Sequence, residues 1–339
     1  SLGGHVAAAC FMADVKALVL VSGTSVDSLK IISMPTTPKD ATVVYSVATT
    51  FKTTYADIAK LSATKYVLVY KTADSATTMY AQTITVNSGM TTATLSTGNP
   101  AITIVSQTVN PVVSRVSATK AVIRYIDASD ILSRVYNTAS DTVETATMAV
   151  EGTTSVLAAD KYSADFLIFT KIAGVPVIVT ETNSDTTSMA SGYTPELSYL
   201  ESTVEVGDVV QMDATHAVFV YREGTNTYMQ AIDFTTEATG AVVLIGTTSV
   251  GDNFNVDKML VKLDTTHVVV TVNGKTKVYA LNLTTHVLTL FGTDTYETDD
   301  SYRASLYDVY SDTVVTNPAI FKTHWDRPNT HLRKLTYIN

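Results

Sequence analysis

The chain has 339 residues, of which 45% are hydrophobic and 16% charged, and its mean hydropathy is +0.17. A formal net charge of −9 and the lack of any Lys/Arg cluster argue against binding to nucleic acid or to an anionic membrane. Cys10 is the single cysteine, which excludes an intramolecular disulfide and any zinc site built from several cysteines. The apolar content excludes disorder, and the wealth of Thr, Val and Tyr favours β-structure.

One short pattern recurs along the chain: an apolar residue, a polar turn that ends in Lys or His, and then an apolar run. Its copies are MADVKALVLV (12–21), LSATKYVLVY (61–70), VSATKAVIRY (116–125), LAADKYSADFLIF (157–169), MDATHAVFVY (212–221), LDTTHVVVTV (263–272) and a degenerate LYDVYSDTVV (306–315). The copies begin about 40 to 55 residues apart, a spacing that indicates propellers or arrays. The first copy contains Asp14 and Lys16 and follows no basic segment, so we expect neither a signal peptide nor insertion into a membrane.

Each unit is predicted to contain several antiparallel strands. The first unit has strand-like runs that begin at Lys16, Ser28 and Thr42. In the fifth unit the predicted strands are Val209–Met212, Ala217–Glu223, Tyr228–Phe234 and Ala241–Gly246. The sixth unit places Asn273-Gly274 between two alternating runs, which is a strong hairpin signal. Four antiparallel strands per repeated unit are typical of propeller blades.

We therefore predict an all-β fold, a single β-propeller domain over residues 1–339 with units that start near 12, 61, 116, 157, 212, 263 and 306. Seven units of this size would close into a ring, and closure buries the apolar faces that no blade can bury alone. Seven blades are therefore favoured over six or eight. An open β-solenoid and two stacked sandwiches are the alternatives. Tyr55–Leu61 is interpreted as a connector. In the last unit we predict strands near Asp312–Phe321 and His331–Ile338, and we expect His5–Phe11 to help close the ring.

The signatures of named propeller families do not recur along the units: neither the Trp-Asp pair of WD repeats, nor the Gly-Gly pair of kelch blades, nor the aspartate box of sialidases. The polar turn that ends in Lys or His, followed by a VVVY-like strand, resembles the divergent propeller repeats of phage tail-fibre, virion-surface and bacterial surface proteins. The resemblance covers most of Met12–Phe291. It implies an extracellular binding or structural role and carries over no catalytic residue.

Two histidines, His216 and His267, lie near acidic residues in their turns, Asp213 and Asp264. Histidines in such surroundings could act as acid/base groups or as metal ligands. The same repeat position is occupied by lysines in other units, at Lys16, Lys65, Lys120 and Lys161. A residue that interchanges with lysine is interpreted as a turn or surface cation.

Three other segments contain candidate site residues. Asn253, Asn255 and Asp257 alternate as oxygen ligands of Ca²⁺ do, although the segment also reads as an Asn-rich turn. Asp294, Glu297, Asp299 and Asp300 form the densest acidic patch, where a facing pair could cleave glycosides and separate carboxylates would simply be solvated. Lys322–His331 is interpreted as a loop in which Trp325, Arg327 and His324 bind a sugar or a protein, or in which Trp325 plugs the last blade.

The function predicted from these features is a non-enzymatic propeller on a virion or cell surface, extracellular, structural or receptor-binding. Its expected partners are other protein subunits of a surface assembly and a glycan or host receptor, and no cofactor is expected other than Ca²⁺. The main alternative is a carbohydrate-active propeller, a lectin or glycoside hydrolase, with its site on one face of the ring. Carboxylates from different blades about 5 to 10 Å apart would favour the hydrolase. An intracellular interaction scaffold is a third alternative.

Overall fold

The computed structural model describes residues 5–13, 16–33, 42–73, 76–104, 111–128, 130–145, 147–150, 158–159, 165–172, 175–183, 189–191, 197, 200, 203–247, 259–272, 275–293, 306–307, 319–326 and 329–336. Every regular element among them is a β-strand. Within these ranges, no helix is long and apolar enough to cross a bilayer.

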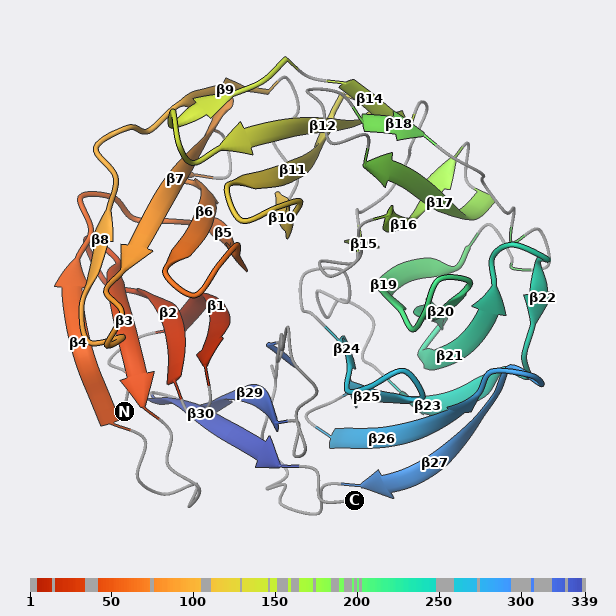
Figure 1. The fold of residues 1–339 in the computed structure, drawn as a ribbon. Helices are drawn as coiled ribbons and strands as arrows, with labels where there is room; N and C mark the ends of the chain where they lie inside the picture. Colours follow the sequence, from red (N-terminus) through yellow and green to blue (C-terminus); the bar gives the residue numbers. More distant parts are fainter. Residues whose placement is uncertain are drawn as a thin grey trace.

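The described strands form seven antiparallel sheets that follow one another around a ring (Figure 1). Blade 1 contains β1 (His5–Ala13), β2 (Lys16–Ser22), β3 (Ser28–Ser33) and β4 (Thr42–Ala48); blade 2 contains β5 (Tyr55–Lys60), β6 (Lys65–Lys71), β7 (Thr78–Val86), β8 (Ala93–Leu95) and β9 (Ala101–Thr103). Blade 3 contains β10 (Val112–Arg115), β11 (Lys120–Asp127), β12 (Asp130–Asn137), β13 (Thr142–Val143) and β14 (Thr147–Val150); blade 4 contains β15 (Ala158–Ala159), β16 (Asp165–Ile172), β17 (Val175–Asn183) and β18 (Met189–Ser191). Blade 5 contains β19 (Glu205–Gln211), β20 (His216–Glu223), β21 (Asn226–Asp233), β22 (Ala238–Thr239) and β23 (Val243–Thr247); blade 6 contains β24 (Leu260–Lys262), β25 (His267–Val272), β26 (Lys275–Asn282) and β27 (Val287–Thr293); blade 7 contains β28 (Leu306–Tyr307), β29 (Ala319–Asp326) and β30 (Asn329–Thr336). The predicted all-β propeller is confirmed, and each sheet is one blade.

The recurring sequence pattern is the turn between the first and second strands of a blade. In blades 2, 3, 5 and 6 the backbone N–H of its opening apolar residue donates to the carbonyl of the Lys or His four positions on, as in Leu61 to Lys65 at 2.9 Å and Met212 to His216 at 2.8 Å. The opening residue is buried in blades 2 and 5, with Leu61 1% and Met212 0% exposed, and is partly buried in blades 3 and 6. The pattern therefore recurs because these four blades turn the chain from the first strand to the second in the same way.

The core lies between neighbouring blades, and alternate residues of a strand face opposite neighbours. On β20, Val218 and Val220 pack in one cluster with side chains of blade 6, such as Val268. Phe219, between them, packs in another cluster with Phe169 of blade 4. Both faces of the second strand are thus covered, and each fully buried aliphatic or aromatic side chain contributes about 1.5 to 3 kcal/mol relative to an exposed one.

Two aspartates on innermost strands connect one blade to the next near the centre of the ring. Asp208, which is 4% exposed, accepts the backbone N–H groups of Met259 at 2.9 Å and Leu260 at 2.8 Å, where blade 6 begins. Asp57, at the corresponding place in blade 2, accepts the N–H of Val113 in blade 3 at 2.9 Å. Asp57 is partly buried, unlike Asp208. Hydrogen bonds to a charged acceptor are stronger than neutral ones, so these carboxylates hold neighbouring innermost strands together.

Two local predictions were wrong. Tyr55–Leu61 is not a connector, because Tyr55–Lys60 is β5, whose Ile58 and Ala59 enter the cores on either side of blade 2. Lys322–His331 is not a loop, because its residues continue two strands, β29 and β30, which pair antiparallel along their whole length. Of the predicted strand Asp312–Phe321, Ala319–Phe321 belong to β29, and residues 312–318 lie outside the described part of the chain.

The first strand also has a more definite place than its sequence indicated. Residues His5–Phe11 belong to β1, which pairs with β2 inside blade 1. On its other side, β1 lies against β28, β29 and β30 of blade 7. β1 therefore lies where blades 1 and 7 meet, and it pairs with none of the described strands of blade 7.

Candidate functional site

His216 begins β20 and is oriented by a turn that its own sequence builds. Asp213 Oδ1 accepts the backbone N–H groups of Thr215 and His216, each at 2.8 Å, and the same carboxylate contacts His216 Nδ1 at 2.9 and 3.0 Å. A carboxylate only accepts, so Nδ1 carries a proton and donates it to Asp213. Burial alone would raise the pKa of Asp213, but hydrogen bonds from Thr215 and His216 outweigh it and hold the pKa below its ordinary value.

Asp233 ends β21 opposite His216 in the strand register. Its Oδ1 accepts the backbone N–H groups of Thr235 at 2.9 Å and Thr236 at 3.3 Å, and the Thr235 hydroxyl at 2.6 Å. Against the raising effect of burial, these bonds lower the pKa of Asp233 to about 2. Asp233 is therefore ionised at neutral pH, and Oδ2 takes part in none of these three bonds.

His286 comes from the neighbouring blade, in the turn between β26 and β27. Its φ of 56° is left-handed, and the turn begins at Asn282, whose side-chain oxygen accepts the N–H groups of Thr284 and Thr285. The turn lies directly on Gly240 of blade 5, where an added Cβ would be 1.7 Å from the carbonyl oxygen of His286. Only glycine permits this approach, so Gly240 allows His286 to lie against blade 5.

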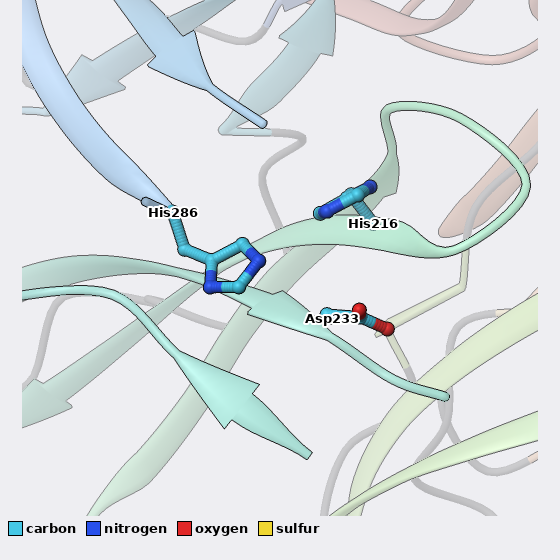
Figure 2. A group of neighbouring side chains, drawn as sticks. All are labelled: His216, Asp233 and His286. Atoms are coloured by element: carbon cyan, nitrogen blue, oxygen red, sulfur yellow. The ribbon is translucent and has the colours of Figure 1, made fainter. Parts of the chain in front are cut away.

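The three side chains converge at the seam between blades 5 and 6 (Figure 2). One potential ligand atom from each of His216, Asp233 and His286 lies within 4.8 Å of the other two. The two imidazole rings have centroids 5.2 Å apart, and all three residues are partly buried. Two imidazoles and a carboxylate are donors that suit transition-metal ions, and they equally allow a carboxylate to stabilise a protonated imidazole.

Equivalent turns in other blades carry different chemistry. Lys16, at the position of His216, donates through Nζ to the carbonyl oxygens of Gly89 and Met90 in the outer turn of blade 2, at 2.9 and 3.1 Å. His267 has the same bonds to Asp264 as His216 has to Asp213, but its ring meets the edge of Phe291 at 5.1 Å between centroids. Among the described seams, the combination of two imidazoles and a carboxylate occurs between blades 5 and 6.

The residues predicted from sequence as ligand sites lie elsewhere. Asn253, Asn255, Asp257 and Arg327 lie outside the described residues, as do Asp294, Glu297, Asp299 and Asp300. His324 and Trp325 are on β29, where the register places them opposite His331 and Thr330. The calcium and sugar-binding predictions for these residues stay predictions.

Sequence reasoning singled out His216 but missed Asp233 and His286. Both lie in the outer turn that precedes the last strand of a blade, which starts with Asn or Asp and reaches a left-handed residue four positions later. Asn137 and Asp141 repeat this arrangement in blade 3. An alignment of the units on this second turn, rather than on the first alone, is the signal that would have found them.

The outer edge of the ring has a second feature of functional interest, which we call the apolar rim: the exposed apolar residues of β4, β23 and β27. β4 reads TVVYSVA and β27 reads VLTLFGT, so neither contains a charged residue or a proline. Val43 is 46%, Leu244 55%, Leu290 52% and Phe291 56% exposed. Soluble proteins usually protect an edge strand with lysine, proline or a bulge, and each of these two strands has only one irregularity in its pairing.

Comparison with known proteins identifies the fold and nothing finer. No protein-family model and no curated protein matches the sequence. Among solved structures, hydrazine synthase from Kuenenia stuttgartiensis is similar with a TM-score of 0.63, 8% identity, and coverage of 98% of this chain and 96% of that one. The periplasmic gluconolactonase of Pseudomonas aeruginosa has a TM-score of 0.56 at 10% identity, covering 85% and 84%. The C-terminal WD40 domain of Sif2 has a TM-score of 0.53 at 10% identity, covering 99% and 96%. The protein is thus a seven-bladed β-propeller like those of lactonases and WD40 proteins.

Proposed function

We propose that this propeller is a non-enzymatic structural or receptor-binding subunit displayed on a virion or cell surface, where it associates with other subunits through the apolar rim. The observation that carries the proposal is the rim itself. Among the described strands, β27 is the outer edge of its sheet, so one row of its backbone N–H and C=O groups faces no described strand of that sheet, and it exposes Leu290 and Phe291. An uncharged apolar edge strand is a template for pairing with another chain.

Two further features support a binding role over a catalytic one. The buried carboxylates of Asp27 and Asp208, and the partly buried carboxylate of Asp57, accept backbone N–H groups, so their described bonds hold the ring together. The repeated polar turn and VVVY-like strand resemble the propeller repeats of phage and bacterial surface proteins, and the chain has only 16% charged residues. A low charge suits faces that are covered in an assembly.

The association is tested with a concentration series of the purified chain in size-exclusion chromatography with light scattering. We expect a mass that rises with concentration, and a monomer when Leu290→Lys places a charge on the edge of β27. Ser25→Lys is the matched control, because it adds the same charge on an exposed residue of the turn between β2 and β3. A wild-type chain that stays monomeric throughout, or association that Leu290→Lys leaves intact, would remove the support for assembly through this rim.

A glycan array, probed with and without calcium, separates the two forms of the proposal. Saturable binding to one class of sugar would make the propeller a receptor-binding subunit, and loss of that binding in Trp325→Ala would place the site near β29. Rim-dependent association without any glycan binding would make it a structural subunit. Turnover of the bound sugar would contradict the non-enzymatic role.

A further inference from the structure

We infer that His216, Asp233 and His286 bind one divalent transition-metal ion, such as Zn²⁺, across the seam between blades 5 and 6. The inference is independent of the apolar rim. It rests on three described features: the orientation of His216, a negative charge that the local fold does not require, and the close approach of the two blades.

The first feature is the way in which His216 is held. Its Nδ1 lies 2.9 Å from Asp213 Oδ1 and Thr215 Oγ1 lies 2.9 Å from the same nitrogen. The carboxylate fixes the proton on Nδ1 and turns Nε2 outward as the potential ligand atom. A histidine that binds a metal through one nitrogen commonly donates from the other to a carboxylate, which orients the ring and raises its basicity. Asp213 has that relation to His216.

The second feature is the charge of Asp233. Asn137 and Asn282 begin the outer turns of blades 3 and 6 and accept backbone N–H groups through their amide oxygens, as Asp233 does with Oδ1. An amide oxygen is thus sufficient to build this turn. The carboxylate in blade 5 adds a negative charge next to two imidazoles, which is what a cation requires.

The third feature is the geometry of the seam. In a tetrahedral site with zinc-to-nitrogen distances of about 2.0 to 2.1 Å, neighbouring ligand atoms are about 3.3 Å apart. The three potential ligand atoms here lie within 4.8 Å of one another. The difference is roughly 1.5 Å, and small rotations of His286 and Asp233 within one staggered conformation can close it while His216 stays on Asp213. Gly240 brings the turn of His286 near enough for this, since any Cβ at that position would meet its backbone.

The donor set decides the class of ion. Ca²⁺ and Mg²⁺ prefer six or more oxygen ligands, whereas two of the three donors here are imidazole nitrogens. Imidazole suits Zn²⁺, Cu²⁺, Ni²⁺ and Co²⁺. Three protein ligands leave a coordination position for water or for a group from a partner molecule, so the ion would link blades 5 and 6 and still face solvent.

The test is a titration of the tag-free full-length chain with Zn²⁺ by isothermal calorimetry, with Co²⁺ absorbance to report the ligand set. We expect one ion per chain in the wild type and a loss of affinity of more than about 100-fold in Asp233→Asn and His286→Asn, since even disturbing an outer-shell partner costs up to that much. Asp233→Asn should retain the fold because asparagine makes this turn in blades 3 and 6. His286→Asn should do so because asparagine tolerates a left-handed backbone.

Two control variants separate this site from the other histidines. His267→Gln alters the equivalent turn, where the ring meets Phe291, and His331→Gln removes one member of the cross-strand pair with His324. Both should bind Zn²⁺ as the wild type does. The inference is overturned if the wild type binds neither Zn²⁺ nor Co²⁺, if Asp233→Asn and His286→Asn bind with unchanged affinity, or if binding is lost in His331→Gln instead.

Discussion

Removal of the Asp208 carboxylate should loosen the ring at its centre. In Asp208→Ala, the N–H groups of Met259 and Leu260 lose a charged acceptor in a buried place. Each buried donor left without a partner costs about 1 to 3 kcal/mol, so the two together cost about 2 to 6 kcal/mol. For 339 residues, an unfolding entropy of about 2.1 cal/mol/K per residue amounts to about 0.7 kcal/mol per degree. The midpoint of thermal unfolding should therefore fall by about 3 to 8 °C.

The matched comparison is Asp57→Ala, because Asp57 accepts one N–H group of the next blade where Asp208 accepts two. Circular dichroism in the β-sheet band should show a smaller decrease in the midpoint for Asp57→Ala, since it orphans fewer N–H groups and Asp57 is only partly buried. Equal decreases in the two variants, or no decrease in Asp208→Ala, would refute the view that these carboxylates hold the blades together.

The remaining predictions concern the seam between blades 5 and 6 and the turns around it. Gly240→Ala should lower both the unfolding midpoint and the affinity for Zn²⁺, because its methyl group would displace the turn of His286; a protein unchanged in both would show that this turn shifts freely. Asp213→Asn should weaken Zn²⁺ binding by about 10- to 100-fold in calorimetry while Asp264→Asn leaves it unaltered, since only the first orients a ligand; equal effects would contradict this. Although burial would raise the pKa of Asp264, hydrogen bonds from Thr266 and His267 hold it below its ordinary value of 3.8. The ionised Asp264 carboxylate therefore stabilises the fold at pH values above the pKa that Asp264 has in the unfolded chain. This stabilisation is lost as pH falls through the lower pKa of Asp264 in the folded chain. The difference in unfolding free energy between wild type and Asp264→Asn should therefore narrow from about pH 5 to about pH 2. A constant difference in urea titrations over that range would exclude this contribution.

The fold could be predicted because the same physical demand is repeated in each blade. A buried second strand needs apolar residues on both faces, and the turn before it needs a small set of polar residues, so blades 2, 3, 5 and 6 share a readable pattern. β5 escaped prediction because its central sequence, Ala-Asp-Ile-Ala, has little β-branching and Asp57 is there for a contact with blade 3. Strands were predicted on either side of Lys322–His331, but the parts of β29 and β30 inside that segment escaped because their polar and charged residues break the apolar run.

The candidate site was less accessible to sequence reasoning, for a geometric reason. His216 could be found because it lies inside the repeated pattern. His286 reaches it only because blades 5 and 6 approach closely at Gly240, and the sequence of one turn does not reveal which turn of the next blade will face it. Asp233 looks like an ordinary turn residue until it is compared with Asn137 and Asn282 in the same role.

The sheets, each made from one contiguous stretch of chain, also indicate how the ring comes together. Every strand pairing among the described residues joins segments that are close in sequence, so each blade can fold from local contacts, which favours fast folding. The contact of β1 with β28, β29 and β30 instead joins segments roughly 300 residues apart, a separation that adds little closure entropy beyond that of a shorter loop. Since no strand ladder joins the described parts of blades 1 and 7, we expect this junction to form last and to open first under heat or mechanical force.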